Sequence, residues 1–203
     1  MFYEEKPDKA FRFGDIISGC IVASPKIKKP ILDNQNHEYI LNIALSQYSA
    51  ILSPSCSIGE RKISLTPLMN VRKSFFENDY FKKDLTRLNR PMERKFTHNP
   101  KKHSKNGELK GNGNVATDLV YSFVELFIYD QHEKLSTYQI RKGGINEDIR
   151  YYMIDFRNIY KLDCDAIEKA ESVPLESKIL QLSNASRCEL IQKLNQYYLR
   201  EIN

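Results

Sequence analysis

The sequence has no tryptophan, only four cysteines and no long apolar run, and these shortages exclude several classes of protein. The cysteines are widely spaced and form no CxxC or Cys/His pattern, so we expect reduced thiols, no metal site and no cofactor. No stretch approaches the roughly 18 apolar residues that cross a bilayer, so we expect no membrane partner. The N-terminus lacks the basic and then apolar design of a signal peptide, which predicts a cytoplasmic protein.

Positive charge is concentrated in one segment of the 203-residue chain. The net charge is +5, but residues 71–114 hold twelve Lys and Arg against five Asp and Glu, a net of +7. The rest of the chain is therefore slightly acidic. Such asymmetry is typical of a polyanion-binding patch, and a solvated loop is the alternative interpretation.

Period-two alternation and β-branched or aromatic runs predict a β-rich protein. Near the middle of the first half, apolar residues 50–52 are followed by a Ser-Pro-Ser-Cys-Ser corner, a glycine turn and a second alternating strand. Small hydroxyl and thiol groups at such a corner would be held rigidly by two strands. The predicted strands cover residues 16–23, 37–45, 50–52, 62–66, 119–129, 136–141 and 149–162.

Helices are expected in two places. Aromatic and aliphatic residues recur near helical spacing over residues 71–88, which predicts one or two short helices that end before Pro91. Residues 95–114 are basic and rich in Gly and Asn, so we expect a mobile loop there. Ser183 can cap a final helix that packs on the sheet. Its predicted apolar stripe is Cys188, Leu190, Ile191, Leu194, Tyr197, Tyr198 and Ile202.

Three short motifs stand in the first third of the chain and together span residues 14–67. They are Gly14-Asp15-Ile16-Ile17, then Tyr48-Ser-Ala-Ile-Leu-Ser-Pro54, then Ile63-Ser-Leu-Thr-Pro67. This order of motifs resembles the MazF/PemK family of small SH3-like barrel toxins. The corner at residues 52–58 is also similar to a Ser-x-Ser/Thr-Cys-Asp-like element of uncharacterised bacterial defence-island proteins. Those proteins are similar to this chain as well in the segment Asp155-Phe156-Arg157 and in the terminal helix.

The MazF/PemK resemblance implies an SH3-like small barrel within the α+β, β-rich fold. The helical and basic insertion, which the compact toxins lack, and the C-terminal helix are predicted from the sequence itself. We therefore expect a single domain over residues 1–203. Its expected parts are residues 14–70 (first part of the barrel), 71–114 (helical and basic flexible insertion), 115–162 (remaining strands) and 183–202 (C-terminal helix).

The same resemblance implies metal-independent RNA cleavage, in which the ribose 2′-hydroxyl attacks the adjacent phosphate. That reaction needs a base for the hydroxyl and a cation for the developing phosphorane charge. Gln47-Tyr48-Ser49 stand where the family has its arginine, and Arg61 across the turn is the candidate substitute. Thr66 matches the family hydroxyl by strand position, and Cys56 is either a nucleophile or a small residue buried at the corner.

Other candidates shape the groove or hold the nucleic acid. Ser53 and Ser55 would line the groove, and Asp15 is either a general base or a turn-fixing residue. Asp155 and Arg157 favour a structural ion pair over a catalytic role. The candidate contacts to phosphates and bases are Lys95, Lys101, Lys102, Lys105, Lys110 and Phe96.

The basic segment predicts a nucleic-acid-binding protein, and the two resemblances imply a bacterial toxin or phage-defence system, with RNA favoured over DNA as its partner. Metal-independent endoribonuclease activity is the catalytic form of this hypothesis. The alternative is a non-catalytic subunit that docks a protein partner of a defence complex. A cognate partner or antitoxin and a homodimer both stay open at this point.

Overall fold

A computed structural model describes most of the chain. The described residues are 1–8, 10–27, 39–54, 57, 62–93, 119–142, 144–163 and 178–199. They form two compact units that are interleaved in sequence. Unit 1 comprises residues 1–4, 69–157 and 182–203, and unit 2 comprises residues 5–68 and 158–181. The single domain expected over residues 1–203 stays a prediction, because compactness does not measure cooperative unfolding.

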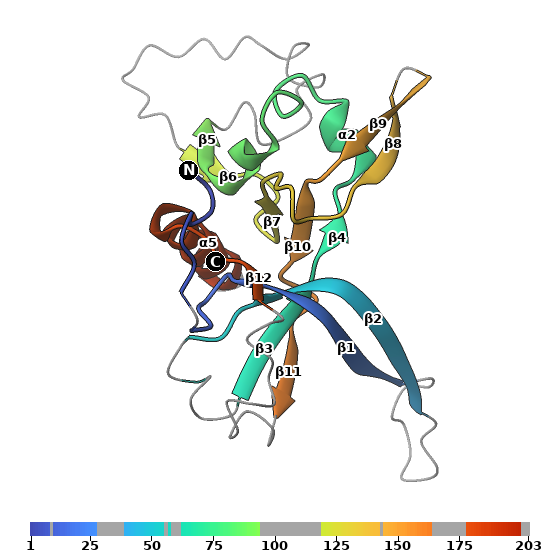
Figure 1. The fold of residues 1–203 in the computed structure, drawn as a ribbon, viewed down its shortest axis with the longest axis vertical. Helices are drawn as coiled ribbons and strands as arrows, with labels where there is room; N and C mark the ends of the chain where they lie inside the picture. Colours follow the sequence, from blue (N-terminus) through green and yellow to red (C-terminus); the bar gives the residue numbers. More distant parts are fainter. Residues whose placement is uncertain are drawn as a thin grey trace. The chain divides into compact units, whose positions relative to one another are not determined.

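Unit 2 is built on a five-stranded antiparallel sheet with the strand order β11-β3-β2-β1-β12 (Figure 1). Its strands are β1 (Ile16–Ile27), β2 (Tyr39–Ile51), β3 (Lys62–Pro67), β11 (Tyr160–Asp163) and β12 (Lys178–Leu180). β1 and β2 pair along their whole length, so the predicted strands at residues 37–45 and 50–52 are one continuous strand.

Alternation along these strands builds the apolar cluster of unit 2. Every second residue of a strand points to the same face of a sheet. Ile17, Ile51, Ile63 and Leu65 form one buried cluster, against which Phe11 packs. The alternation read from the sequence at residues 62–66 therefore identified a buried face correctly.

Unit 1 contains a three-stranded antiparallel sheet of order β4-β10-β7 and two separate strand pairs, β5-β6 and β8-β9 (Figure 1). Its strands are β4 (Met69–Asn70), β5 (Pro91–Glu93), β6 (Leu119–Tyr121), β7 (Leu126–Tyr129), β8 (Tyr138–Lys142), β9 (Ile145–Ile149) and β10 (Tyr152–Asp155). Its helices are α2 (Lys73–Phe76), the 3-10 helix η1 (Leu85–Asn89) and α5 (Asn184–Leu199).

The core of unit 1 is rich in aromatic and branched side chains. β7 and β10 are buried along their entire length. The principal cluster joins residues of α2, η1 and the strands: Val71, Phe75, Phe76, Phe81, Leu85, Leu88, Met92, Leu126, Ile128, Ile140, Ile149 and Met153. The helical spacing over residues 71–88 predicted one or two short helices, and the structure has two, α2 and η1. The phenylalanines and leucines of that spacing are buried, as predicted.

Two long runs that predicted single strands are interrupted in the structure. The run at residues 119–129 splits into β6 and β7 because Phe123 turns the chain, with the Leu126 amide donating to the Phe123 carbonyl at 2.9 Å. β6 then pairs with β5, whereas β7 pairs with β10. The run at residues 149–162 splits into β10 of unit 1 and β11 of unit 2.

The fold class of the described residues is a β-rich α+β protein, as the sequence predicted. The described strands form open sheets and no closed barrel. No helix among the described residues is both long enough and apolar enough to cross a membrane.

Candidate nucleic-acid interface

The described part of the basic segment, residues 71–93, separates its apolar residues from its charges. Its phenylalanines and leucines lie in the core of unit 1, whereas every Lys and Arg side chain faces solvent. We call these six cations the cationic face: Arg72, Lys73, Lys82, Lys83, Arg87 and Arg90. Burial of one side and exposure of the other present the positive charge outward from an anchored segment.

Local hydrogen bonds hold this segment in place. The Asp84 side chain caps η1 by accepting from the Thr86 amide at 2.9 Å and from the Thr86 hydroxyl at 2.6 Å. At the other end, the Asn89 side chain accepts from the Ile128 amide and donates to the Ile128 carbonyl, both at 2.7 Å. The buried amide thereby replaces a neighbouring strand for one residue of β7. These contacts make η1 a fixed support for Arg87 and Arg90.

The cations of this face differ in how they are paired. Lys73 and Lys82 form exposed ion pairs with carboxylates of their own segment. Exposed pairs contribute only about 0–1 kcal/mol, so they leave these charges open to a stronger polyanion.

The Arg87 guanidinium lies 5.5 Å from the centre of the Tyr80 ring and donates to the Tyr80 carbonyl at 3.2 Å. A guanidinium stacked on an aromatic ring keeps N–H groups free for a phosphate.

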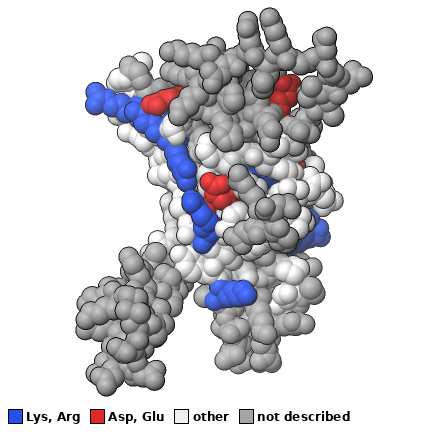
Figure 2. All heavy atoms as spheres, turned by 180° about the vertical axis from the view of Figure 1, so that it is seen from behind, with Lys and Arg blue, Asp and Glu red and all other residues white. Residues whose placement is uncertain are grey.

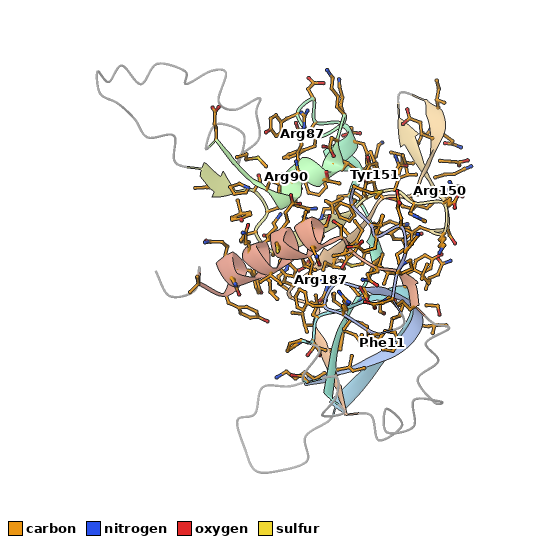
Figure 3. The ribbon with its side chains drawn as sticks, turned by 60° about the vertical axis from the view of Figure 1, so that its left-hand side comes forward. Phe11, Arg87, Arg90, Arg150, Tyr151 and Arg187 are labelled. Carbon is orange, nitrogen blue, oxygen red and sulfur yellow. The ribbon has the colours of Figure 1, made fainter. Side chains whose placement is uncertain are left out.

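Arg90 connects η1 to the terminal helix. Its Nε donates to Glu189 Oε1 at 2.7 Å, and Figure 3 shows Arg90 beside α5, the helix that carries Glu189 and Arg187. Figure 3 places Arg87 near Arg90 on the same segment. In Figure 2, Lys and Arg side chains also form a row on the side of unit 1 where the β8–β9 hairpin lies.

The most basic residues of the sequence lie outside the described part of the chain. They are Lys95, Lys101, Lys102, Lys105, Lys110 and Phe96. The described strands on either side of them pair with each other, with Glu93 opposite Leu119 and Pro91 opposite Tyr121. The segment that carries these residues therefore begins after β5 and ends before β6, two strands that pair with each other. β5 itself begins directly after Arg90.

Three of the residues predicted for the groove, Asp15, Ser53 and Thr66, belong to the described part of the chain, and all three are buried in unit 2. Asp15 Oδ2 accepts from the Arg12 amide at 2.8 Å, and the turn before it has Gly14 at a φ of 85°. Asp15 Oδ2 also pairs with Lys178 Nζ at 2.7 Å. The turn-fixing interpretation of Asp15 matches this geometry, whereas no sequence pattern indicated its lysine partner.

Lys178 joins the chain before β1 to β12. Besides Asp15, its ammonium donates to the Ala10 carbonyl at 2.6 Å and to the Gln181 side chain at 2.9 Å. It also lies within 3.1 Å of the Asp8 carbonyl. This network fixes the start of the five-stranded sheet.

Ser53, which lies just after β2, and Thr66 of β3 both lie where β2 and β3 are joined. The Ser53 hydroxyl accepts from the Ser64 amide of β3 at 2.6 Å, and Thr66 of β3 pairs with Ala50 of β2. Thr66 has an exposed fraction of 0%. The other residues predicted for this groove, Ser55, Cys56 and Arg61, lie outside the described residues.

Asp155 and Arg157 form the structural ion pair that their spacing predicted. The Asp155 carboxylate accepts from the Arg157 amide at 3.0 Å and from Arg157 Nε at 2.8 Å, and it also contacts a terminal nitrogen of the same guanidinium. Burial acts to raise the pKa of Asp155, but the hydrogen bonds from Arg157 and the charge of Arg72 outweigh it and lower the pKa. Arg157 is therefore committed to Asp155.

The terminal helix buries only part of the predicted stripe. Ser183 caps α5, as expected, by accepting from the Ser186 amide at 3.2 Å. Leu190 of the stripe is buried and Leu194 and Tyr197 are half-buried, whereas Cys188, Ile191 and Tyr198 are exposed. The helix also buries Ser186 and Lys193, which lie outside the predicted stripe. Helical spacing is compatible with more than one buried stripe on this helix, and the stripe that the structure buries includes Lys193.

Lys193 is the main titratable group that the sequence did not identify. Its Nζ donates to the Leu88 carbonyl of η1. Burial lowers its pKa well below the ordinary lysine value, and the charge of Glu125 opposes this shift only in part. Because its exposed fraction is 0%, a ligand would not reach Lys193, and we assign it to the core.

Comparison with known proteins gives no relative for this fold and these residues. No protein-family model, no curated protein and no solved structure matches the chain. The functional argument therefore rests on the chain's own residues.

Proposed function

We propose that this protein binds nucleic acid, RNA in preference to DNA, through the cationic face of unit 1 and the lysines that follow it in the sequence. The observation that carries the proposal is the exposure of all six Lys and Arg residues on a segment anchored by its apolar side chains. The expected setting is the cytoplasm, in a bacterial toxin or phage-defence system.

Phosphate binding by this surface has a specific physical signature. Each phosphate neutralised by a Lys or Arg releases condensed counterions, so log K falls with log salt by about 0.7 per contact on a single strand. Arg87 and Lys83 are exposed, and neither forms an ion pair with a carboxylate among the described residues. They are therefore the strongest candidates for phosphate contacts. Lys95, Lys101, Lys102, Lys105 and Lys110 would add contacts, and Phe96 would add stacking.

Metal-independent RNA cleavage is the catalytic part of the proposal, and it depends on an SH3-like arrangement of unit 2. The five-stranded antiparallel sheet supports this interpretation, since SH3-like barrels are built from such strands. In the proposed roles the ribose 2′-hydroxyl is the nucleophile, Arg61 stabilises the phosphorane charge, and Thr66 contributes a hydroxyl. The groove would be shaped by Asp15, Ser53, Ser55 and Cys56. Because Thr66 is fully buried, its hydroxyl would reach a substrate only after a local rearrangement.

A protein-docking subunit is the second candidate, and one surface of unit 1 favours it. The exposed residues of α5 between Cys188 and Leu199 are entirely uncharged, although 28% of the whole chain is charged. Depletion of charge is characteristic of the centre of protein interfaces. The partner in this case would be a cognate protein or antitoxin, or a second copy of the chain.

A titration in EDTA tests binding and cleavage together. Labelled single-stranded RNA and duplex DNA are titrated with the protein at low and moderate salt, and polarisation reports binding while a gel of the same samples reports cleavage. Salt-sensitive RNA binding supports the proposal, and cutting in EDTA supports its catalytic part. No binding to either nucleic acid would exclude nucleic-acid binding and leave the docking subunit.

Charge-reversal variants show where the nucleic acid binds. The double variant Lys83→Glu/Arg87→Glu should weaken RNA binding and flatten its salt dependence. The matched control Lys134→Glu/Lys161→Glu makes the same change in net charge at two exposed positions outside the cationic face. Equal losses in the two double variants would mean that only net charge matters.

Two further variants test the remaining parts of the proposal. Reversal of Lys101, Lys102 and Lys105 to glutamate tests the basic segment beyond the described residues. The substitution Arg61→Ala should abolish cleavage in a protein that stays folded, and persistent cleavage would exclude the proposed role of Arg61.

A further inference from the structure

Phe123 occupies a backbone conformation that bulky residues seldom adopt. Its φ is 46°, in the left-handed region, where a side chain with a Cβ crowds the backbone. The residue lies in the turn between β6 and β7, and its carbonyl accepts from the Leu126 amide. Glycine would fill this position without strain. Residues held in such conformations concentrate at functional sites, so a large aromatic at this position is a candidate for a functional role.

The Phe123 side chain is also the exposed end of a chain of aromatic contacts. It keeps 37% of its surface accessible and meets Phe75 of α2 edge to face, with ring centres 4.9 Å apart. Phe75 in turn contacts Phe81 at 6.0 Å, and Phe81 contacts Tyr80 at 5.3 Å. The buried rings of Phe75 and Phe81 therefore connect Phe123 and Tyr80, the two aromatic side chains of this series that reach the solvent.

A cation accompanies one end of this aromatic chain, where the Arg87 guanidinium lies over the Tyr80 ring. The helix that carries Phe75 begins with the exposed Lys73, which pairs with Glu77. An apolar docking site for a protein does not need a cation on the same aromatic support. An unpaired nucleotide, in contrast, offers an aromatic face and an anionic phosphate together.

We infer that Phe123 is a stacking platform for an unpaired base of single-stranded nucleic acid, with Arg87 binding a phosphate of the same strand. This inference rests on the proposed function and specifies its ligand. Stacking on an aromatic ring tolerates any base, because every base has a π face. A duplex keeps its bases stacked on one another, so it cannot use the Phe123 ring in this way. The site therefore selects single strands without reading their sequence.

A tryptophan substitution makes stacking directly visible. The chain has no tryptophan, so Phe123→Trp introduces a single indole at the proposed site. Addition of an unlabelled single-stranded RNA of mixed sequence should quench its fluorescence and shift its maximum. A blunt-ended RNA duplex with the same number of nucleotides should leave the spectrum unchanged. The control Ile145→Trp places the only indole at a 70% exposed position of β9, where we expect no quenching by either RNA.

A second variant removes the ring without straining the fold. Phe123→Gly suits the positive φ but also removes the ring contact with Phe75, so a thermal melt must first show that the variant stays folded. Since stacking contributes about 1–3 kcal/mol per base, the affinity for the single strand should fall roughly 5- to 150-fold. The salt dependence should stay the same, because the phosphate contacts remain. Phe123→Tyr keeps a ring and should restore most of the affinity.

The outcomes separate this inference from the proposal on which it rests. If the wild-type protein binds no nucleic acid, the proposed function and the stacking platform are both excluded. If it binds single strands with a normal salt dependence, but Phe123→Gly binds equally well and the fluorescence of the Phe123→Trp variant does not change, only the stacking platform is excluded. Equal quenching of the indoles at positions 123 and 145 would also exclude it, since contact would then not be specific.

Discussion

The two units of this protein each bury the side chain of a lysine, and they treat its charge in opposite ways. In unit 2 the Lys178 side chain, 6% exposed, pairs with the buried Asp15 carboxylate at 2.7 Å and has further oxygen acceptors around it. In unit 1 Lys193 has an exposed fraction of 0% and donates to the carbonyl of Leu88. The first ammonium is matched by a carboxylate, whereas the second lies in an environment that lowers its pKa.

This difference shows that burial alone does not define the role of a lysine. An ion removed from water is tolerated when an opposite charge and hydrogen bonds surround it, and otherwise its pKa moves toward the neutral form. Lys178 therefore holds the start of the sheet together through its ion pair with Asp15. Lys193 contributes mainly through the packing of its apolar methylene groups, and its amino group donates a hydrogen bond to the Leu88 carbonyl.

The largest expected effect comes from breaking the Lys178 pair. Lys178→Met leaves the Asp15 carboxylate buried without its cation, and removal of one partner of a buried pair costs about 3–5 kcal/mol. Urea unfolding should show this loss, and hydrogen exchange should place it in β1 and β12. The double variant Lys178→Met/Asp15→Leu removes both charges and should recover part of the stability. A loss of unfolding free energy below about 1 kcal/mol would mean that the Lys178–Asp15 pair does not hold the start of the sheet together.

The same substitution at Lys193 should have the opposite sign. Lys193→Met keeps the length of the side chain and removes the polar tip, so the free energy of unfolding should stay unchanged or rise by up to roughly 2 kcal/mol. Lys193→Ala, in contrast, empties the space that the stem fills and should destabilise by about 2–5 kcal/mol. If Lys193→Met destabilised as much as Lys178→Met, the contrast between the two units would be wrong.

A pH series tests the contrast further, because Lys193 is the described lysine whose pKa is lowered. Its unfolded-state pKa is about 10.4, so between the folded and unfolded pKa values the unfolded chain binds more protons. Stability should therefore rise with pH in that window, and the rise should disappear in Lys193→Met. The series should stop below about pH 10, where tyrosines ionise in the unfolded chain.

Burial raises the pKa of Tyr138 to about 12, so its contribution to stability is lost as the pH rises toward that value.

The smallest effect concerns the helix that carries Lys193. Ser183→Ala removes the hydroxyl that accepts from the Ser186 amide, and loss of an N-cap costs about 1 kcal/mol. Hydrogen exchange should increase in α5 and stay constant in the strands around Lys178. Ser183→Asp can accept the same hydrogen bond and should restore protection. An equal change in both units would show that they unfold together.

Most of the secondary structure could be predicted from local patterns. Alternation located the strands at both ends of the Ser-Pro-Ser-Cys corner, and helical spacing located α2, η1 and α5 with the Ser183 cap. The pattern failed at residues 119–129, where a continuous apolar run contains a turn. A left-handed Phe123 has no local signal, because nothing in its neighbours distinguishes it from a strand residue.

The candidate interface was predictable in its charge and not in its geometry. The excess of Lys and Arg over residues 71–114 is a property of composition. The stacking of Arg87 on Tyr80 and the contact between Phe75 and Phe123 join residues 7 and 48 positions apart. A basic segment with interleaved aromatics was the available signal for the first contact. No periodicity indicates the second.

Neighbouring residues were enough to dictate the β-rich class, the concentration of positive charge and the positions of the helices, because each of these is a local property. Which lysine is paired and which is buried almost alone depends on the tertiary fold, since Asp15 and Lys178 are 163 residues apart and Leu88 and Lys193 are 105 apart. Desolvation depends on everything that surrounds a group in space. The order of residues along the chain does not contain this information in any local form.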